Sequence, residues 1–368
     1  MTQRLPPSLT PLDIALAAIL RGVEPVVPVD LLLAEALGCV AAEMPPLSAL
    51  PPCDIAATDG WALRANDLVG ASSYSPLPLT APPAWVEAGD AMPEQCDCVL
   101  DADAVDTSGP ISEVLAECLP GEGVRRMGRD IAEGTPVVIP GRPVQMAAVM
   151  LARSVALDTL SVRRPRLRVV NSPGGAAAAH LIADHARAAG AEAVAADASA
   201  RDVVSIANSL DATACDLLLT VGGTGVGRHD AAVAALADRG EVLAHGIALQ
   251  PGRTAAIGRI GSVPVVALPG SPDQALAVWL ALVRPVLDRL SARQLRKPVT
   301  MPLARKIASS VGVAEIALLA EEQGAWLPLA IGELSLQTIA RADAWLLIPG
   351  DSEGFAAGAG VDAYLIRE

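Results

Sequence analysis

Leu217-Leu-Leu-Thr-Val-Gly-Gly-Thr-Gly-Val-Gly-Arg-His-Asp230 is the stretch that decides the fold. Its first five residues predict a buried strand, and four glycines follow within the next six positions. Glycines let backbone N–H groups approach a phosphate, a following helix N-terminus adds positive potential, and parallel sheets bind ligands at their strand ends. We therefore predict an anion-binding loop, with an ordinary glycine-rich turn as the alternative. The predicted binding residues are Gly222, Gly223, Thr224, Gly225 and Gly227.

The sequence on both sides of this loop alternates between strand and helix patterns. Strands are expected at 167–170, 193–195, 217–221, 242–247 and 263–268. Helices are expected at 176–189, 202–210, 231–237 and 272–290. Such alternation indicates right-handed βαβ units and a parallel sheet that is covered on both faces. The expected fold class is therefore α/β, in a chain whose length of 368 residues calls for several domains.

The remaining regions have other patterns. Helices are expected at 10–21 and 29–37, and another from Pro143. Residues 53–122 carry short apolar runs between Pro, Gly and Asp, which predicts a small β-rich insert. The tail from Lys297 has short apolar runs between turns and no long helical pattern, which predicts an all-β module.

Two further loops follow predicted strands of the α/β region. Pro251-Gly252-Arg253 offers an arginine whose planar fork matches an oxyanion, although a solvated surface arginine fits equally well. Pro269-Gly270-Ser271-Pro272 precedes a helix, and a simple N-cap would by itself explain Ser271. Two acids stand in turns elsewhere, Asp59 and Asp130, where a structural turn is the simpler interpretation.

Composition limits the classes of partner. The net charge of −14 argues against nucleic acid, whose binding relies on clustered Lys and Arg. The longest apolar stretch is far shorter than the roughly 20 residues that span a bilayer, and the N-terminus has no apolar core of the signal-peptide type. The six cysteines include no CxxC pair, so buried, reduced thiols are expected. We expect a soluble protein of the cytoplasm that binds neither nucleic acid nor membrane.

The motifs, in this order, resemble the molybdopterin molybdenumtransferase family, the MoeA type that includes the E domain of gephyrin. Residues 35–38 resemble its EALG motif, and residues 51–62, PPCDIAATDGWA, its PPFDNSAMDGYA segment. Residues 88–97 and 124–131 are similar to TGAPLPEGAD and VRxxGEDI. The loops at 222–230, 251–253 and 268–272 resemble GGVSVGDYD, KPGKP and LPGNP.

The resemblance implies a homodimer of four-part subunits. Its parts would be an extended N-terminal dimerisation domain (1–52 and 123–164), the β-rich insert (53–122), the α/β molybdopterin-binding domain (165–294) and a C-terminal β domain (295–368). It implies transfer of molybdenum from molybdate to adenylylated molybdopterin, with AMP released. It maps catalytic acids onto Asp59, Asp130 and Asp230 and places a divalent cation, Mg²⁺, on Asp59 and Asp230.

The chain also departs from the family pattern. Where the family has TGDEL, this chain reads Ser172-Pro-Gly-Gly175, so both acids are gone, and Gln250 replaces the first lysine of KPGKP. The loop GGTGVG is closer to the GGTG of molybdopterin adenylyltransferases. An alternative is therefore a diverged molybdopterin-binding protein that delivers the cofactor to a molybdoenzyme. Which molybdoenzyme would be served, and which divalent cation, stays open.

Overall fold

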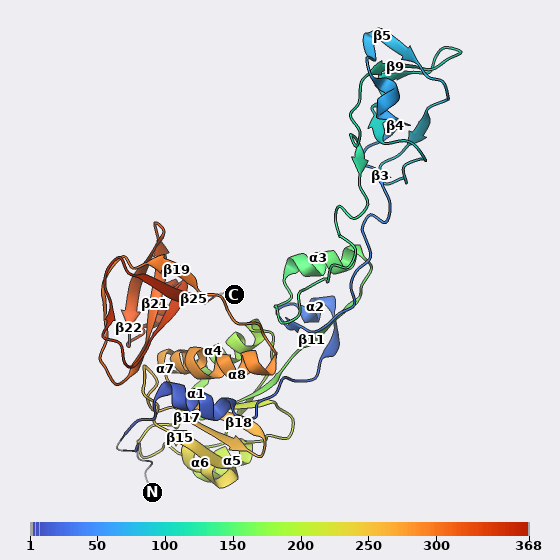
Figure 1. Ribbon diagram of the computed structural model, residues 1–368. Coiled ribbons are helices and arrows are strands. Elements are labelled where there is room, and N and C mark those ends of the chain that lie inside the picture. The colour runs from blue at the N-terminus through green and yellow to red at the C-terminus, as the bar shows by residue number, and fades with distance from the viewer. Residues whose placement is uncertain (1–2, 4, 7, 367–368) are drawn as a thin grey trace. The chain divides into compact units, whose positions relative to one another are not determined.

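In a computed structural model, the described part of the chain comprises residues 3, 5–6 and 8–366 (Figure 1). It forms two compact units. Unit 1 contains the described residues up to Glu43, together with Val138–Val149 and the described residues from Asp158 onward. Unit 2 contains Met44–Val137 and Met150–Leu157. The four-part division expected from the resemblance stays a prediction.

The main sheet of unit 1 has the strand order β13-β12-β14-β18-β17-β15. Its strands are β12 (Arg166–Asn171), β13 (Glu192–Asp197), β14 (Leu217–Val221), β15 (Glu241–His245), β17 (Ala256–Ile260) and β18 (Val263–Leu268). The first four strands in this order are parallel, but β17 is antiparallel to both of its neighbours. The expected parallel pairing therefore holds for these four strands, and β17 departs from it. The reason is a two-residue Gly261-Ser262 turn that folds β17 and β18 into a hairpin.

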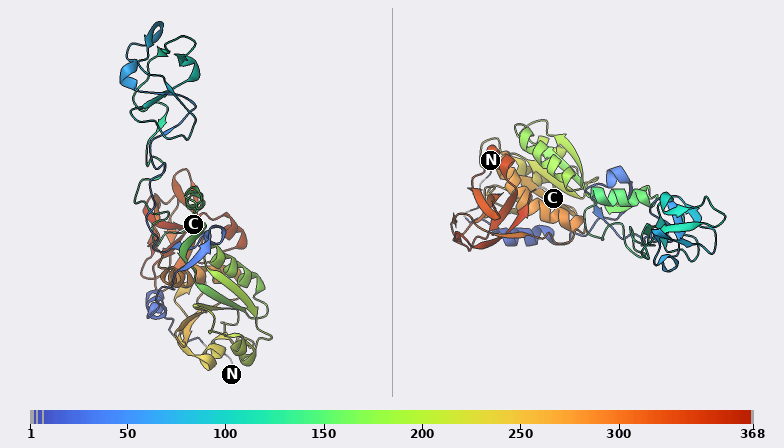
Figure 2. Two further views of the ribbon diagram at one scale, coloured as in Figure 1. Left: turned by 90° about the vertical axis from the view of Figure 1, so that its right-hand side faces the viewer. Right: turned by 90° about the horizontal axis from the view of Figure 1, so that it is seen from above.

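Helices cover both faces of this sheet (Figures 1 and 2). One face packs against α1 (Leu12–Leu20), α4 (Ala176–Ala188), α7 (Pro272–Val278), the π-helix η3 (Trp279–Val283) and α8 (Arg284–Leu290). The other packs against α5 (Val203–Ser209) and α6 (Ala232–Arg239). Side chains alternate along β14, so that Leu217 and Leu219 enter the first core and Leu218 the second. Each such buried leucine contributes roughly 1.5–3 kcal/mol.

The register of the central strands determines where their loops emerge. Asn171 at the end of β12 lies beside Val221 at the end of β14, and Val221 lies beside Leu268 at the end of β18. The loops that follow these three strands therefore leave the same edge of the sheet. Two of these loops, at 222–230 and 269–272, carry predicted binding residues, and the third begins at Ser172.

A smaller part of unit 1 corrects another expectation. The helix expected at 29–37 is instead a strand, β1 (Val29–Leu32), followed by the short helix α2 (Leu33–Ala36). β1 pairs with β11 (Thr159–Arg163), which also pairs with β2 (Val40–Ala41). Pairing with a strand distant in sequence overrides the local helical pattern. The helix expected from Pro143 is α3 (Met146–Ser154).

The C-terminal part of unit 1 is built from strands, as expected. One sheet has the order β16-β21-β23-β25-β19, with β22 paired to β21, and β20 pairs with β24. The strands are β16 (Leu249–Gln250), β19 (Val299–Pro302), β20 (Ile307–Ala308), β21 (Ala314–Glu322), β22 (Ala325–Ile331), β23 (Ala344–Ile348), β24 (Gly354–Phe355) and β25 (Gly360–Leu365). A short helix, α9 (Leu336–Arg341), lies between β22 and β23. Trp326 and Ile348 are buried in the core of this part.

Unit 2 contains the expected β-rich insert. Its small sheets have the orders β6-β4-β7, β5-β9-β8 and β10-β3. The elements are β3 (Ile55–Ala56), β4 (Gly60–Leu63), η1 (Ala65–Leu68), β5 (Ser72–Pro78), β6 (Ala84–Val86), β7 (Cys98–Leu100), η2 (Ala102–Ala104), β8 (Val105–Asp106), β9 (Glu113–Ala116) and β10 (Val124–Arg125). Trp61 and Trp85 face each other across β4 and β6 in an edge-to-face pair, with ring centroids 5.0 Å apart.

Candidate functional site

A cavity of about 310 Å³ opens at the strand-end edge of the main sheet. We call it the glycine-loop cavity. Its lining comes mainly from the loops after β12, β14 and β18, with Arg201 from the loop after β13, Thr254 from the loop after β16 and Gln274 from α7. The lining residues are Ser172, Pro173, Gly174, Gly175, Arg201, Gly222, Gly223, Thr224, Gly225, Asp230, Thr254, Pro269, Gly270, Ser271 and Gln274. The structure thus brings together most of the predicted binding residues, while Gly227, Pro272 and residues 251–253 lie outside this lining.

Glycine is required where two of these loops approach each other. A Cβ atom on Gly270 would stand 3.2 Å from the Cα atom of Gly222. Gly222 and Gly223 also have positive φ angles of 92° and 75°, which side chains other than glycine adopt at a cost. The glycines of the motif therefore do more than form a turn, because they keep the floor of the cavity free of side chains.

Two buried hydroxyl groups of the cavity have no hydrogen-bond partner among the described residues. These are the Oγ atoms of Ser172 and Ser271. Ser271 occupies the N-cap position of α7, but its side chain makes no capping hydrogen bond, so capping alone does not account for it. A buried hydroxyl without a partner is costly. Both residues line the cavity, so a polar ligand there is a candidate partner for each hydroxyl group.

Two charged side chains line the glycine-loop cavity, Asp230 and Arg201. The Asp230 Oδ2 atom accepts a hydrogen bond of 2.7 Å from the Gly227 amide. Its Oδ1 atom lies 3.6 Å from Nη2 of Arg201. Sequence reasoning missed Arg201, which precedes α5 in a segment without any recognisable motif. Only its position after a neighbouring parallel strand, β13, could have pointed to this edge.

Two N-terminal amides of α6 already donate hydrogen bonds to a side chain. The Oε1 atom of Gln3 accepts hydrogen bonds from the amides of Val233 (2.9 Å) and Ala234 (3.2 Å). Its Nε2 atom donates to the carbonyl groups of Gly223 and Gly225. The glycine motif predicted that this helix terminus would add positive potential for an anion. In the structure a neutral side chain occupies it instead.

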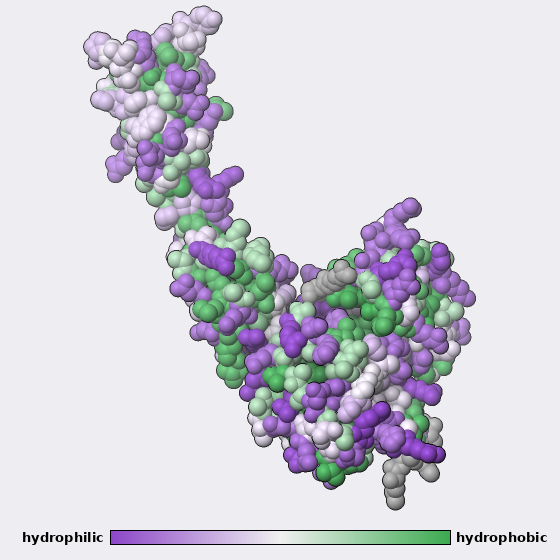
Figure 3. All heavy atoms as spheres, turned by 180° about the vertical axis from the view of Figure 1, so that it is seen from behind, coloured by the Kyte–Doolittle hydropathy of each residue, from purple (hydrophilic) through white to green (hydrophobic). Residues whose placement is uncertain are grey.

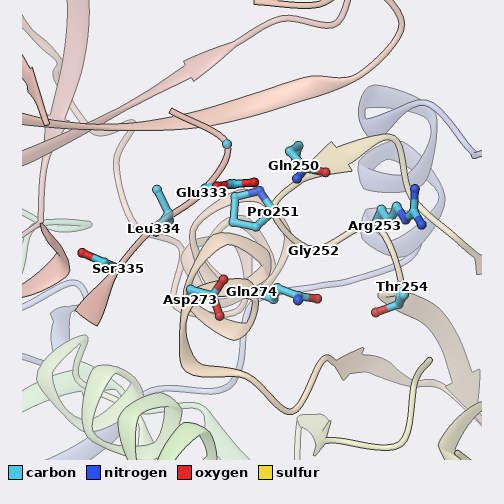
Figure 4. Close-up of a pocket in the computed structure, with 11 residues that line it drawn as sticks. Gln250, Pro251, Gly252, Arg253, Thr254, Asp273, Gln274, Glu333, Leu334 and Ser335 are labelled. Carbon is cyan, nitrogen blue, oxygen red and sulfur yellow. The ribbon is translucent and has the colours of Figure 1, made fainter. Parts of the chain in front are cut away.

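A second, larger cavity of about 710 Å³ lies next to the first (Figure 4). The predicted residues Pro251, Gly252 and Arg253 line it, and Figure 4 shows Arg253 across from Leu334 and Ser335. Its other lining residues are Gln250, Thr254, Asp273, Gln274, Gly332 and Glu333. Thr254 and Gln274 line both cavities. Oγ1 of Thr254 lies 3.2 Å from Oγ1 of Thr224. The two cavities therefore share a wall.

Comparison with known proteins identifies the family. The family described as "MoeA N-terminal region (domain I and II)" matches residues 10–156, and "Probable molybdopterin binding domain" matches residues 175–289. Molybdopterin molybdenumtransferase 2 of Mycobacterium tuberculosis is 31% identical over 71% of this chain and 74% of its own length. The chain belongs to the molybdopterin molybdenumtransferase family. A molybdopterin molybdenumtransferase of Synechococcus elongatus is 25% identical over 85% of this chain and 88% of its own length.

Solved structures of the same family share the fold. A molybdopterin biosynthesis MoeA protein from Pyrococcus horikoshii superimposes with a TM-score of 0.75 at 22% identity, over 97% of this chain and all of the other. A second structure of this kind gives a TM-score of 0.76 at 24% identity. Mixed α/β architecture across nearly the whole chain is therefore a property of the family, as the resemblance predicted.

The acids that the family resemblance maps onto this chain lie in different units. Asp59 and Asp130 belong to unit 2, and Asp230 belongs to unit 1. The Oδ1 atom of Asp59 accepts a 2.7 Å hydrogen bond from the Ala88 amide, and Asp130 pairs with Arg125 at 3.3 Å. These contacts give both acids of unit 2 a structural role. Their catalytic roles stay predictions.

The glycine-loop cavity fits a resident Mg²⁺ poorly. It offers one carboxylate, Asp230, with an amide on one oxygen and a guanidinium group near the other. Mg²⁺ prefers oxygen ligands in octahedral geometry, and a positive charge so close opposes its binding. Within the described residues, no three His, Cys, Asp or Glu side chains are grouped so as to hold a metal ion.

The cysteines take no part in either cavity. All six are free, and Cys39, Cys98, Cys118 and Cys215 are buried. Burial raises the pKa of Cys118 to about 11 and that of Cys215 to about 11, which disfavours the reactive thiolate. The expectation of burial is confirmed for these four.

Proposed function

We propose that this protein transfers molybdenum from molybdate to adenylylated molybdopterin and releases AMP. One observation carries the proposal, namely the glycine-loop cavity with its two unpartnered hydroxyl groups, in a chain of this family. The relatives from M. tuberculosis and S. elongatus are both named molybdopterin molybdenumtransferase, which supports the same reaction class here.

We assign one of the two substrates to each cavity. The pterin and its phosphate groups occupy the glycine-loop cavity, where bare backbone allows close approach. Molybdate occupies the adjoining cavity, where Arg253 attracts the oxyanion. Cleavage of the phosphoanhydride bond adds one oxygen atom, from molybdate or water, to phosphorus and releases AMP. The dithiolene then binds the molybdenum through its two sulfurs in place of an oxygen ligand, which leaves with the two thiol protons as water. The chain's contribution is positioning and electrostatic stabilisation.

The reaction can be tested directly by incubating the full chain with adenylylated molybdopterin, with and without molybdate. AMP is followed by chromatography, and pterin-bound molybdenum by elemental analysis of the separated product. The proposal requires AMP release that depends on molybdate and matches the molybdenum incorporated. Tight binding of the pterin without molybdate-dependent AMP release would overturn it. That result would leave a protein that delivers the cofactor to a molybdoenzyme.

We also propose that the working form is a homodimer in the cytoplasm. Large apolar side chains are exposed in two segments of the chain, at 27–37 and 139–150. Figure 3 shows apolar surface over the part of unit 1 that carries α2 and β11. A second copy would remove this surface from water. Light scattering should give twice the mass of one chain, and a fully active monomer would contradict the proposal. None of the helices in the described residues is long and apolar enough to cross a bilayer.

A further inference from the structure

Arg201 is the single cationic side chain among the residues that line the glycine-loop cavity. It stands in the segment between β13 and α5, so its backbone emerges at the same sheet edge as the glycine loop. Its Nη1 atom lies 3.8 Å from the position that a Cβ atom on Gly174 would take, and its Nη2 atom lies 3.6 Å from Asp230. The guanidinium group therefore lies between the loop after β12 and the loop after β14.

The pairing of Arg201 with Asp230 is loose. At 3.6 Å it is an ion pair without a hydrogen bond, and the other oxygen of Asp230 accepts a hydrogen bond from the Gly227 amide. Among the described residues, none accepts a hydrogen bond from Arg201. The side chain is 46% exposed, so it can turn into the cavity. A guanidinium group has five N–H donors in a planar fork that matches phosphate oxygens.

The other sources of positive potential at this cavity are reduced. Gln3 occupies the first-turn amides of α6. The stretch that resembles the family's TGDEL segment carries Gly174 and Gly175, so the carboxylates that could recruit a cation are missing. A pyrophosphate group that enters the cavity thus meets one formal positive charge, that of Arg201.

We propose that Arg201 binds the phosphate groups of the adenylylated pterin directly and takes the place of a divalent cation in neutralising them. This inference rests on the proposed function for the identity of the ligand. It makes ligand binding independent of Mg²⁺, in contrast to what the resemblance implies. It also explains why the cavity tolerates the absence of two acids. With those acids gone, the guanidinium group is neutralised only in part by Asp230.

The test is calorimetric titration of adenylylated molybdopterin into the full chain, once with a chelator and once with Mg²⁺. The variants are Arg201→Gln, which removes the charge, and Arg201→Lys, which keeps the charge but loses the fork. Arg239→Gln is the matched control, because Arg239 is an exposed arginine at the end of α6 outside both cavities. Thermal unfolding of each variant shows whether it is folded.

We expect the wild-type Kd to be the same in chelator and in Mg²⁺. Arg201→Gln should bind about ten- to a hundredfold more weakly in chelator, as for the loss of a hydrogen bond to a charged group. Mg²⁺ should partly restore ligand binding by Arg201→Gln, because Asp230 is no longer beside a guanidinium charge and can bind the cation. The Kd of Arg201→Lys in chelator should lie between those of the wild type and Arg201→Gln, and the Kd of Arg239→Gln should equal that of the wild type. A merely structural role for Arg201 would not create a dependence on Mg²⁺.

Two outcomes overturn the inference while leaving the proposed function in place. One is wild-type binding that requires Mg²⁺, and the other is unchanged binding by folded Arg201→Gln in chelator. A third outcome, no binding by the wild type in either buffer, overturns the proposed function and the inference together. The comparison of the two buffers therefore separates the failure of one from the failure of the other.

Discussion

Replacing Ser172 with alanine should make the protein more stable and its ligand binding weaker. The Ser172 side chain is only 3% exposed, and its hydroxyl group has no partner among the described residues. A buried hydroxyl without a partner costs about 1–3 kcal/mol. Ser172→Ala removes that cost and leaves a gap of one oxygen atom. We expect the free energy of unfolding to rise by up to about 1 kcal/mol, or Tm by roughly 2–4 °C.

The same substitution removes a hydrogen bond to the ligand. One such bond contributes about 0.5–1.5 kcal/mol, so the Kd for adenylylated molybdopterin should rise about two- to thirteenfold. Calorimetry measures the Kd, and urea denaturation measures the free energy of unfolding. Opposite changes in stability and affinity identify a group that the fold retains for a ligand.

Two control variants make the comparison strict. Thr220 is also buried without a partner for its hydroxyl, but it lies outside both cavities, so Thr220→Val should raise stability and leave Kd unchanged. The buried hydroxyl of Ser291 donates to the Leu287 carbonyl at 2.7 Å, so Ser291→Ala should lower stability by about 1 kcal/mol. A Ser172→Ala protein that loses stability, or that binds ligand like the wild type, would refute the reasoning.

Three other outcomes follow from the structure. Arg253→Gln should raise the molybdate concentration needed for AMP release about tenfold or more without changing the Kd for the pterin. An equal loss of affinity for molybdate and for the pterin would contradict the placement of molybdate beside Arg253. Gly258→Ala should lower the free energy of unfolding by about 3 kcal/mol, because the new Cβ atom would meet the Glu241 carbonyl oxygen. Gly261→Ala, where the space is open, should lower it by only about 1–2 kcal/mol, and urea denaturation measures both. Burial lowers the pKa of His185, so the unfolded chain binds the extra proton and stability falls as pH drops below about 6.5. His185→Gln should weaken that dependence, which urea denaturation at about pH 5.5 and about pH 7.5 can measure.

The glycine loop was predictable because its signal is local. An apolar strand that runs into Gly222 and Gly223 specifies both the backbone geometry and the sheet edge. Arg201 was not predictable in this way, because it reaches the cavity only through the parallel pairing of β12 with β13. Gln3 reaches α6 from the far end of the sequence, and no periodicity reports such a contact.

The two errors in the fold have different origins. Strand β17 was overlooked because Ala256–Ile260 contains Gly258 and an arginine, which interrupt the apolar pattern. The helix expected at 29–37 failed because β1 pairs with β11, about 130 residues away. Local propensity therefore failed once where a distant partner overrides it, at β1, and once where the strand's own apolar pattern is interrupted, at β17.

The tryptophans give each unit its own optical signal. Trp61 and Trp85 form their edge-to-face pair within unit 2, while Trp279, Trp326 and Trp345 are buried in unit 1. Coupled indole rings produce a circular-dichroism band that disappears when the pair separates, whereas buried indoles shift their fluorescence to longer wavelength on exposure to water. Unfolding of the two units can therefore be followed separately in one unlabelled sample, without cutting the chain.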